Sequence, residues 1–486
     1  MPSQTLIERS VNSVKWNSIN SIATIVLGLF QTILLARLLP VATFGVYTAA
    51  VSVIALTRVI SNFGMGSAFL NRSPETMDLD RIAANHFTIS LLLTVVWAVL
   101  VLAGVLIFVD PSQAELKQVF IVLIFSDIAV QLTNTHRTIL VRHVQHQRLA
   151  LLNLTAMIVT AIISIALALL GFTIWALLAS NLVNAILNVI FLVVWRPVWR
   201  LRLEWNPVII RYLLNYGFRT FISRLLLDAL DRIDDLWTVT FLGTEALGYY
   251  SRAYRFATYP RAFVAKPIYL VAGGTYAELK EDRERLSKAF VRINSFMIRS
   301  GFLLAGFLAL IAPEFIKLAL GEKWLPVLDA FRLMIVYTLF DPVKQTIAKL
   351  FNVVGQPEIV MRIRAIQLVV MAIGLFLLGS ALELSGVALA VDIMLVTGII
   401  LLFRQAKMLV DYSIKSMLMV PTIALIFGLI AGLTIAHRPE IAGNDLLIGL
   451  AKTIVYAGVY GSILLIWDRQ QVGDMIALIR RYLLKR

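Results

Sequence analysis

The 486-residue sequence contains no cysteine and only five histidines. Without cysteine the sequence can form no disulfide, no thiol catalytic site and no cysteine-bound metal site. His143 and His146 have i, i+3 spacing, but no carboxylate stands near them to complete a metal site. No Walker motif, glycine-rich nucleotide loop or catalytic cluster is present. We therefore expect a protein that is not an enzyme and needs no cofactor.

Charge is also scarce, and apolar residues dominate. Only 15% of the residues are charged, 59% are hydrophobic, and the mean hydropathy is +0.84. A helix needs about 20 apolar residues to cross the hydrocarbon core of a bilayer. The sequence therefore predicts an all-α integral membrane protein with about fourteen transmembrane helices. We place them at residues 14–36, 43–70, 86–109, 118–141, 151–171, 174–195, 211–242, 245–275, 293–318, 327–351, 364–381, 385–403, 416–437 and 445–467.

Basic residues in the loops predict how the chain is oriented. They gather in both termini and in the even-numbered loops, whereas the odd-numbered loops hold only Arg37, Lys117, Lys323 and Arg438. By the positive-inside rule, both termini are then cytoplasmic. Residues 1–15 are polar and no small-residue cleavage site follows, so the first helix is expected to remain as an anchor. The net charge of +15 thus reflects topology, and we expect no nucleic-acid partner.

Two regions of the sequence that lie 203 residues apart resemble each other. Phe44-Gly45-Val46-Tyr47 recurs as Leu247-Gly248-Tyr249-Tyr250, and Arg58 corresponds to Arg261. Six predicted helices separate the copies, so both have the same orientation, as in transporters built from parallel repeats. We predict an N-terminal lobe at residues 1–210 and a C-terminal lobe at residues 211–405. Two extra helices at residues 406–467 and an amphipathic cytoplasmic tail at residues 468–486, lying on the anionic inner leaflet, would follow.

Cations inside the predicted helices are the most informative feature of the sequence. A lysine or arginine at the centre of a spanning helix costs about 2.5–3.5 kcal/mol, so it normally faces protein or a water-filled cavity. These cations are densest between Arg219 and Lys266, where they outnumber the acids. The sequence therefore predicts a basic cavity for an anionic cargo. Its candidate binding residues are Arg58, Arg219, Arg224, Arg252, Arg255, Arg261, Lys266 and Lys344.

The predicted helix at residues 211–242 carries acids as well as cations. Its stripe at i, i+4, i+7, i+11 spacing consists of Arg224, Asp228, Asp231 and Asp235. One interpretation is an ion-pair ladder, in which Asp228 pairs with Arg224 or Arg232. The other is that acids titrate during transport and couple it to an ion. The candidates for ion coupling are Asp228, Asp231 and Asp392.

The predicted helix at residues 245–275 carries its cations near two prolines. One face holds Arg252, Arg255, Tyr259 and Lys266. Pro260 and Pro267 predict interruptions, because each proline removes a backbone hydrogen bond and favours a kink. Pro342, close to Lys344, predicts another break. Freed backbone groups at membrane depth need protein or water around them, so these helices should line the cavity.

Other features have two interpretations each. A polar stripe in the first helix would bind sugar hydroxyls or join helices by hydrogen bonds; it consists of Asn17, Asn20, Thr24 and Gln31. For the lone charges Arg299 and Asp392, a structural partner is favoured over a ligand. The last two predicted helices are either an added packing pair or a hydrophobic surface for a lipid chain.

Three runs resemble motifs of a known family. Residues 242–255, Leu-Gly-Thr-Glu-Ala-Leu-Gly-Tyr-Tyr-Ser-Arg-Ala-Tyr-Arg, are similar to a segment typical of Wzx-type polysaccharide flippases. Residues 36–50 and residues 350–357, the latter Leu-Phe-Asn-Val-Val-Gly-Gln-Pro, support this resemblance, which covers residues 14–403. The family belongs to the MOP superfamily, which also contains the MATE multidrug exporters and the lipid II flippase.

The resemblance implies a two-lobed, V-shaped transporter in the bacterial inner membrane. Such a protein moves undecaprenyl-diphosphate-linked oligosaccharide from the cytoplasmic to the periplasmic leaflet, for exopolysaccharide or O-antigen synthesis. The implied partners are that lipid-linked oligosaccharide, membrane lipids, and polymerase and export proteins of the same pathway. The main alternative is a MATE-like, ion-coupled exporter of small organic cations, which needs an acidic, aromatic pocket. A membrane scaffold without transport activity is a further alternative.

Overall fold

The computed structural model describes residues 6–71, 78–260, 266–436 and 444–469, together with residues 471 and 473. All regular secondary structure in these residues is helical, as predicted. The chain divides into two compact units, Met1–Gly248 and Tyr249–Arg486. Residues 207–248 belong to the first unit, whereas the predicted lobe boundary falls after residue 210. The division into lobes therefore stays a prediction, and most of the predicted tail lies outside the described residues.

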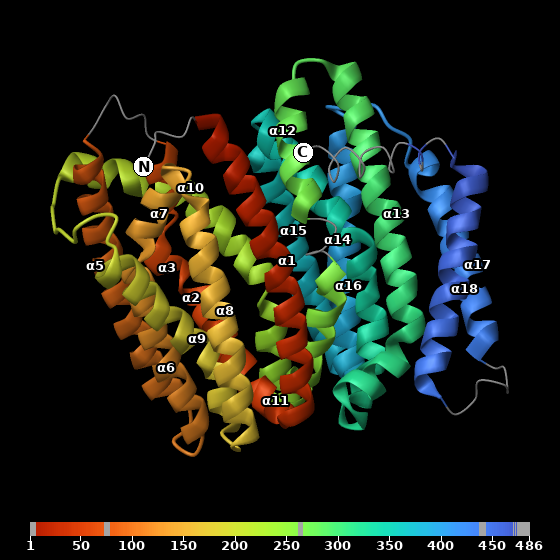
Figure 1. The fold of residues 1–486 in the computed structure, drawn as a ribbon, viewed down its shortest axis with the longest axis horizontal. Helices are drawn as coiled ribbons and strands as arrows, with labels where there is room; N and C mark the ends of the chain where they lie inside the picture. Colours follow the sequence, from red (N-terminus) through yellow and green to blue (C-terminus); the bar gives the residue numbers. More distant parts are fainter. Residues whose placement is uncertain are drawn as a thin grey trace. The chain divides into compact units, whose positions relative to one another are not determined.

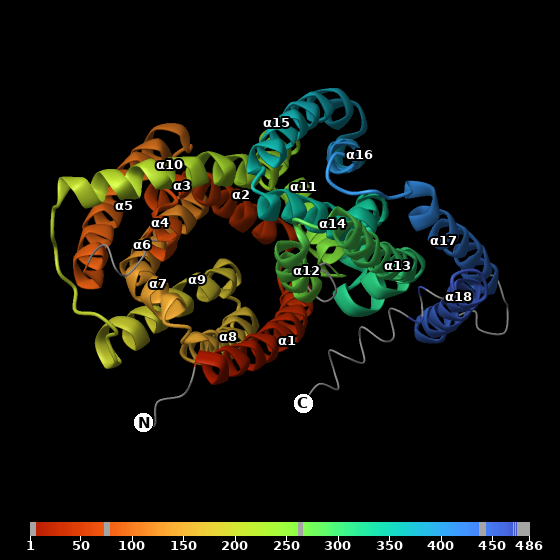
Figure 2. The same ribbon diagram turned by 90° about the horizontal axis from the view of Figure 1, so that it is seen from above.

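The first unit is built from long helices that stand side by side, with shorter helical segments between them (Figures 1 and 2). They are α1 (Leu6–Leu38), α2 (Val41–Thr57), α3 (Val59–Asn62), α4 (Met65–Asn71), α5 (Leu79–Phe108), α6 (Ala114–Leu132), α7 (Asn134–Arg142), α8 (His146–Leu169), α9 (Thr173–Val189), the π-helix η2 (Ile190–Trp195), α10 (Pro207–Leu230) and the beginning of α11 (Ile233–Pro260). α8 packs between α1 and α9, α6 packs on α2, α5 and α9, and α10 packs on α4 and α5.

The second unit begins within α11, and its described residues form ten further helical segments. They are α12 (Lys266–Leu279), α13 (Arg283–Phe315), η4 (Ile316–Leu320), η5 (Glu322–Val327), α14 (Leu328–Val354), α15 (Pro357–Gly374), η6 (Leu375–Gly379), α16 (Ser380–Ala406), α17 (Ile414–Ala436) and α18 (Asp445–Trp467). α14 packs against α12, α13 and α16. α17 and α18 pack against each other and against α13, so the last two helices are attached to one helix of the unit.

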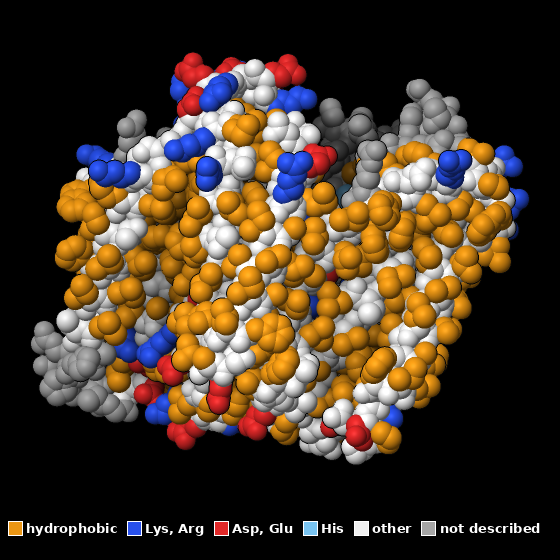
Figure 3. All heavy atoms as spheres, turned by 180° about the vertical axis from the view of Figure 1, so that it is seen from behind, with side chains coloured by type: hydrophobic (Ala, Val, Ile, Leu, Met, Phe, Trp, Pro, Cys, Tyr) orange, Lys and Arg blue, Asp and Glu red, His pale blue; other side chains and the backbone are white. Residues whose placement is uncertain are grey.

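The number of membrane spans is smaller by a strict criterion than the fourteen that were predicted. Eight helical stretches in the described residues are long and apolar enough to cross a membrane, or up to nine if the bent pair α6–α7 is one span. Charged helices such as α10, α11 and α14 fail this test, so the count of fourteen is not confirmed. Figure 3 shows hydrophobic side chains covering the middle of one face, with lysines and arginines gathered along its upper edge. This distribution is typical of a membrane protein.

The charged region between Arg219 and Lys266 divides differently from the prediction. α10 ends at Leu230 and α11 begins at Ile233, with Asp234 and Asp235 in its first turn. Acids at a helix start are stabilised by the helix dipole. The predicted stripe is therefore wrong, because Asp235 lies on a different helix from Arg224.

One of the three prolines that were predicted to interrupt helices can be assessed in the described residues. α11 is described as far as Pro260 and α12 from Lys266, with residues 261–265 outside the description, so the interruptions at Pro260 and Pro267 stay predictions. α14, however, continues through Pro342. An ideal Cβ at Gly301 of α13 would lie 3.2 Å from the carbonyl oxygen of Thr338, the group that Pro342 cannot hydrogen-bond. The close approach of α13 thus covers the freed carbonyl, so a break at Pro342 is not needed.

The predicted repeat has a structural counterpart within the first unit. Pro40 and Gly243, which are 203 residues apart, both have extended ψ values, of 150° and 177°, immediately before a helical run. An ideal Cβ at Gly45 would lie 1.6 Å from the backbone oxygen of Thr244, and one at Gly248 would lie 2.3 Å from that of Val41. Val41 and Thr244 also correspond in the repeat. The two helical runs therefore cross at matching glycines, which supports the repeat.

Candidate functional site

The first unit holds a hydrogen-bonded group of one arginine and several asparagines on α7, α8 and α9. Arg137 of α7 donates from Nε to Oδ1 of Asn188 at 2.9 Å and from Nη2 to Oδ1 of Asn153 at 3.4 Å. Asn188 in turn donates to Oδ1 of Asn184 at 2.7 Å. Asn181 completes the row on α9 and accepts from the Tyr47 hydroxyl at 2.9 Å. We call Arg137, Asn153, Asn181, Asn184 and Asn188 the amide network.

The amide network is only partly enclosed. Asn188 is buried, whereas Asn184 is exposed and Arg137, Asn153 and Asn181 are half-buried. The acceptors of Arg137 are neutral amides, so its guanidinium is hydrogen-bonded without being neutralised. An arginine within a broken membrane span that keeps its charge needs a polar environment. The network therefore offers positive charge and amide groups on a surface that does not suit lipid.

Arg58, a predicted binding residue, lies on a neighbouring part of the first unit. It stands at the junction of α2 and α3, and its Nη1 is 3.2 Å from Oδ1 of Asp127 on α6. The Arg58 side chain remains 42% exposed, whereas that of Asp127 is 11% exposed. Two residues of α3 next to Arg58 accept hydrogen bonds. Gln131 donates from Nε2 to the Ser61 hydroxyl at 3.0 Å, and Asn134 donates from Nδ2 to Oδ1 of Asn62 at 3.4 Å. These contacts fix α3 while leaving much of the Arg58 guanidinium accessible.

One residue of the predicted polar stripe on α1 forms a hydrogen bond to another helix. Gln31 donates to the Ser164 hydroxyl of α8 at 3.1 Å. Helix–helix bonding is therefore the correct interpretation for Gln31. The side chain of Asn17 lies outside the described residues.

One acid of α10 and one of α11 are paired with arginines. Arg224 Nε lies 2.9 Å from Asp228 Oδ2, which confirms that predicted pair. Arg232 pairs with Asp235 at 3.3 Å instead of with Asp228, because the helix ends between them. Asp235 also accepts from the Ser52 hydroxyl at 2.7 Å, which ties α11 to α2. The ion-pair interpretation thus holds for Asp228, and Asp235 has a structural role.

The remaining predicted cations of this region fall into different environments. Arg252 is buried and Arg255 is exposed, although both were expected on one face of α11. Arg219 lies on α10 and Lys266 begins α12, but their side chains, like the whole of Arg261, lie outside the described residues. Whether the predicted cations come together is therefore not tested, and their joint role stays a proposal.

Two further candidates lie in the core of the second unit. Lys344 Nζ is 3.6 Å from Oδ1 of Asp341 and 5.8 Å from the ring centre of Tyr337. Asp392 is buried in α16, and its Oδ1 has no hydrogen-bond partner among the residues that the structure describes. A structural partner was favoured for Asp392, so this unpartnered oxygen argues against that interpretation.

Two buried cations of the second unit have structural partners. Arg299 of α13 is bound through Nε by Asp468 at 2.7 Å, and only 1% of its side chain is exposed. Lys452 of α18 is 2.5 Å from Glu314 of α13. The Tyr456 and Tyr460 hydroxyls of α18 donate to backbone oxygens of α13, each at 2.8 Å. The last helix is therefore an added packing element fixed to α13 by ion pairs and hydrogen bonds.

The sequence analysis missed the amide network, although its signal was present. Asn181, Asn184 and Asn188 have i, i+3, i+7 spacing in an otherwise apolar segment and form one face of a helix. Asp127 and Arg137 are the only charges in the predicted helix at residues 118–141.

Known proteins with solved structures share this fold. The chain is similar to the lipid II flippase MurJ in an inward closed conformation, with a TM-score of 0.76, 18% identity, and coverage of 94% of this chain and 99% of MurJ. It is also similar to an inward-facing multidrug resistance MATE family transporter of the MOP superfamily, with a TM-score of 0.61, 20% identity, and coverage of 82% and 98%. At these identities the likeness shows the fold alone, and it confirms the predicted all-α, MATE-like architecture.

A protein with a similar sequence is a lipopolysaccharide biosynthesis protein. The lipopolysaccharide biosynthesis protein WzxC of Escherichia coli (strain K12) is 22% identical over 358 residues, which cover 73% of this chain and 72% of WzxC. Residues 34–329 match the family model described as polysaccharide biosynthesis protein. That segment is more than half of the chain and includes Arg58, the amide network and the ion pairs of α10 and α11. This multi-pass membrane protein belongs to the polysaccharide biosynthesis protein family, as its sequence motifs predicted.

Proposed function

We propose that this protein is a flippase that moves undecaprenyl-diphosphate-linked oligosaccharide from the cytoplasmic to the periplasmic leaflet. The observation that carries this proposal is the polar surface of the first unit. There Arg137 is bound by neutral amides and keeps its charge, and the Arg58 side chain, although paired with Asp127, is 42% exposed. Guanidinium groups suit phosphate oxygens, and amides suit sugar hydroxyls. Membership of a polysaccharide biosynthesis family supports the same cargo.

The cargo would be bound by groups of two kinds. In this scheme Arg58, Arg219, Arg224, Arg252, Arg255, Arg261, Lys266 and Lys344 supply the basic path for the diphosphate. Among them, Arg255 has the best support, because it is exposed. The side chains of Arg58 and Arg224 are exposed as well, but each is partly neutralised by an acid, Asp127 or Asp228. The amide network would contact the sugars, and transport would proceed by alternating access.

Ion coupling belongs to the same proposal. Of the three predicted acids, Asp392 has the strongest support, because it is buried and its Oδ1 is without a partner in the described part of the chain. Asp228 is paired with Arg224 and is a weaker candidate. Asp231 follows the end of α10 and stays a candidate.

The cellular setting also belongs to the proposal. The basic loops support cytoplasmic termini and a place in the bacterial inner membrane. Polymerase and export proteins of the same polysaccharide pathway would be the protein partners. Export of small organic cations, as by a MATE transporter, is less well supported. It needs an acidic pocket, yet Asp228 and Asp235 are neutralised by arginines.

The test is a leaflet assay in proteoliposomes with a fluorescent oligosaccharide-diphosphate-polyprenol and an impermeant quencher. The variants are Arg58→Gln combined with Asp127→Asn, which removes a charge pair without leaving a lone acid, and Arg255→Glu. The control is Arg362→Gln, which removes another exposed arginine. Loss of a charge-assisted hydrogen bond of about 1.5–3 kcal/mol predicts transport slowed roughly 10- to 100-fold in the first two variants.

Thermal unfolding in detergent would establish that each variant remains folded. If wild type moves the lipid-linked oligosaccharide and both variants do so at its rate, the assignment of these arginines is wrong. If wild type moves organic cations and no lipid-linked sugar, the flippase proposal itself fails.

A further inference from the structure

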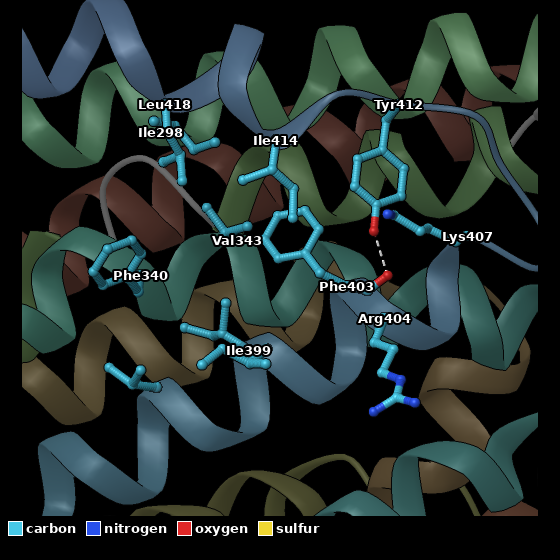
Figure 4. A pocket seen from close by; sticks show the side chains of 12 residues that line it. Ile298, Phe340, Val343, Ile399, Phe403, Arg404, Lys407, Tyr412, Ile414 and Leu418 are labelled. Carbon is cyan, nitrogen blue, oxygen red and sulfur yellow. Dashed lines mark hydrogen bonds between the residues drawn. The ribbon is translucent and has the colours of Figure 1, made fainter.

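The second unit contains an apolar pocket with a volume of about 360 Å³ (Figure 4). Its walls come from α13, α14, α16 and the start of α17. The lining side chains are Ile298, Phe340, Val343, Val396, Ile399, Ile400, Phe403, Arg404, Lys407, Tyr412, Ile414 and Leu418. All of these are apolar except Arg404, Lys407 and Tyr412. The pocket therefore has a hydrophobic body and polar groups supplied from the last turns of α16 and the segment after it.

The polar end of the pocket is cationic. Arg404 and Lys407 lie in and just after the last turn of α16, and both side chains are exposed. Figure 4 shows them on the same side of the pocket as the Tyr412 hydroxyl. The neighbouring acid, Asp411, is bound in a bidentate manner by Arg283, with N–O distances of 2.9 and 3.1 Å. Asp411 is thus already paired, and the two cations face outward beside a hydrophobic cavity.

The segment that closes this end of the pocket is held in place. Tyr412 donates a hydrogen bond to the backbone oxygen of Phe403, and its ring centre lies 5.3 Å from that of Phe290. Burial raises the pKa of Tyr412 to about 12, so the hydroxyl stays protonated and keeps donating. The backbone N–H of Asp411 donates to the Ser287 hydroxyl at 2.8 Å. The pocket is therefore preformed and not a gap in a loose linker.

The pocket is open on a hydrophobic surface. Ile400 and Val396, which line it from α16, are 61% and 37% exposed, and Ile414 of α17 is 39% exposed. In a membrane protein such side chains contact acyl chains. A hydrophobic cavity open to acyl chains, with arginine and lysine at one end, matches the two parts of a phospholipid. Arginine and lysine near a membrane surface attract anionic lipid headgroups.

We propose that this pocket is a binding site for an anionic phospholipid of the membrane. One acyl chain occupies the hydrophobic body between α14, α16 and α17, and the phosphate is bound by Arg404 and Lys407. We choose a phospholipid over the transported lipid for two reasons. A single phosphodiester matches the two cations Arg404 and Lys407, and phospholipids surround the protein in the membrane. The bound lipid would fill the space where α17 leaves α16, and would stabilise that junction. This inference does not depend on which cargo the protein moves.

Because the sequence has no cysteine, a single introduced cysteine can report on this site alone. Ile400→Cys, labelled with a small fluorophore, places the probe in the pocket wall. The full-length protein is reconstituted in phosphatidylcholine vesicles that contain a minor fraction of nitroxide-labelled phosphatidylglycerol or phosphatidylcholine. Ile162→Cys on α8, which is 64% exposed before substitution, gives a matched probe far along the chain from the pocket.

The expected result is stronger quenching by the labelled phosphatidylglycerol than by the labelled phosphatidylcholine in the Ile400→Cys protein, and equal quenching in the Ile162→Cys protein. Replacing Arg404 and Lys407 by Gln should weaken the phosphatidylglycerol preference about 30-fold, the effect of removing two cations near an anionic lipid. The control with the same charge change is Arg362→Gln with Lys415→Gln, two exposed cations outside the pocket lining.

Native mass spectrometry of the same proteins, without a label, gives a second readout. Wild type and the control should retain phosphatidylglycerol, and the Arg404→Gln/Lys407→Gln variant should lose it. Equal quenching of the Ile400→Cys probe by the two phospholipids would overturn the proposal, as would a variant that loses no more lipid than the control. Displacement of phosphatidylglycerol by a polyprenyl diphosphate at equal concentration would assign the pocket to the transported lipid, and would also overturn it.

Discussion

Intramembrane cations of the two units illustrate two kinds of partner. In the first unit, Arg137 is bound by the neutral amides of Asn153 and Asn188. In the second unit, Arg299 and Lys452 are bound by the carboxylates of Asp468 and Glu314. A carboxylate neutralises its partner, whereas an amide only orients it. Arg299 and Lys452 thus attach α18 and the residue after it to α13, whereas Arg137 keeps its positive charge within its amide contacts.

The exposure of the side chain also distinguishes Arg58 of the first unit from Arg299 of the second unit. The Arg58 side chain is 42% exposed although it contacts Asp127, whereas that of Arg299 is 1% exposed. Both residues are arginines in otherwise apolar segments, and the sequence alone gives little reason to treat them differently. The comparison teaches that an intramembrane arginine indicates a ligand site only when its partner and its surroundings leave the charge accessible.

The largest effect is expected from breaking a carboxylate partnership in the second unit. Glu314→Leu would leave Lys452 buried without its partner, and should lower the free energy of unfolding by about 3–5 kcal/mol. Thermal unfolding in detergent measures this. The double variant Glu314→Leu/Lys452→Met should recover most of the loss, because no unpaired charge remains. A single variant as stable as wild type would mean that the pair is not needed to attach α18.

The next largest effect is expected at the helix crossing in the first unit. Gly45→Ala would place a Cβ 1.6 Å from the backbone oxygen of Thr244, so the helices must move apart. Overpacking of this kind should cost about 1–3 kcal/mol of unfolding free energy. Gly104→Ala is the control, because no atom lies within 4 Å of its ideal Cβ. Equal stability of the two variants would contradict the tight crossing and weaken the structural support for the repeat.

The comparison itself can be tested by converting one kind of partner into the other. Asn188→Asp keeps the acceptor for Arg137 but supplies a carboxylate, as in the second unit, and removes the Nδ2 donor that binds the backbone and side-chain oxygens of Asn184. Transport of the lipid-linked oligosaccharide should fall about tenfold, because the cation is neutralised, and loss of the donor should lower the free energy of unfolding by about 1–3 kcal/mol. The leaflet assay gives the rate, and Asn188→Gln controls for the loss of the native amide position. Wild-type transport by the Asn188→Asp variant would remove Arg137 from the proposed site.

The smallest effect is expected for the exposed pair on α10. The Arg224 side chain is 60% exposed, so its contact with Asp228 is solvent-accessible or faces polar groups. Arg224→Gln should therefore change the unfolding free energy by only about 0.3–0.5 kcal/mol. Thermal unfolding at two salt concentrations measures the effect and its screening. A loss as large as that of Glu314→Leu would show that this pair is structural after all.

The sequence by itself determined the class, the family and much of the helix pattern. Apolar runs of membrane length require helices, because every backbone group in lipid must be hydrogen-bonded within the chain. The predicted gap at residues 382–384 coincides with the break at Glu383, where φ is 50°. The repeat could be predicted from the sequence as well. Gly45 and Gly248 occupy matching positions because a Cβ at either one would collide with the backbone of the other copy.

Only the tertiary structure decided what each buried charge does. The partners of Arg58, Arg137, Arg299 and Lys452 lie between 16 and 169 residues away in the chain. Such contacts depend on which helices pack together, and hydropathy does not encode that. The helix end at Leu230 likewise moved Asp235 from the predicted stripe into a contact with Ser52. Local pattern therefore predicts where helices form, whereas the chemistry of a site follows from packing between distant segments.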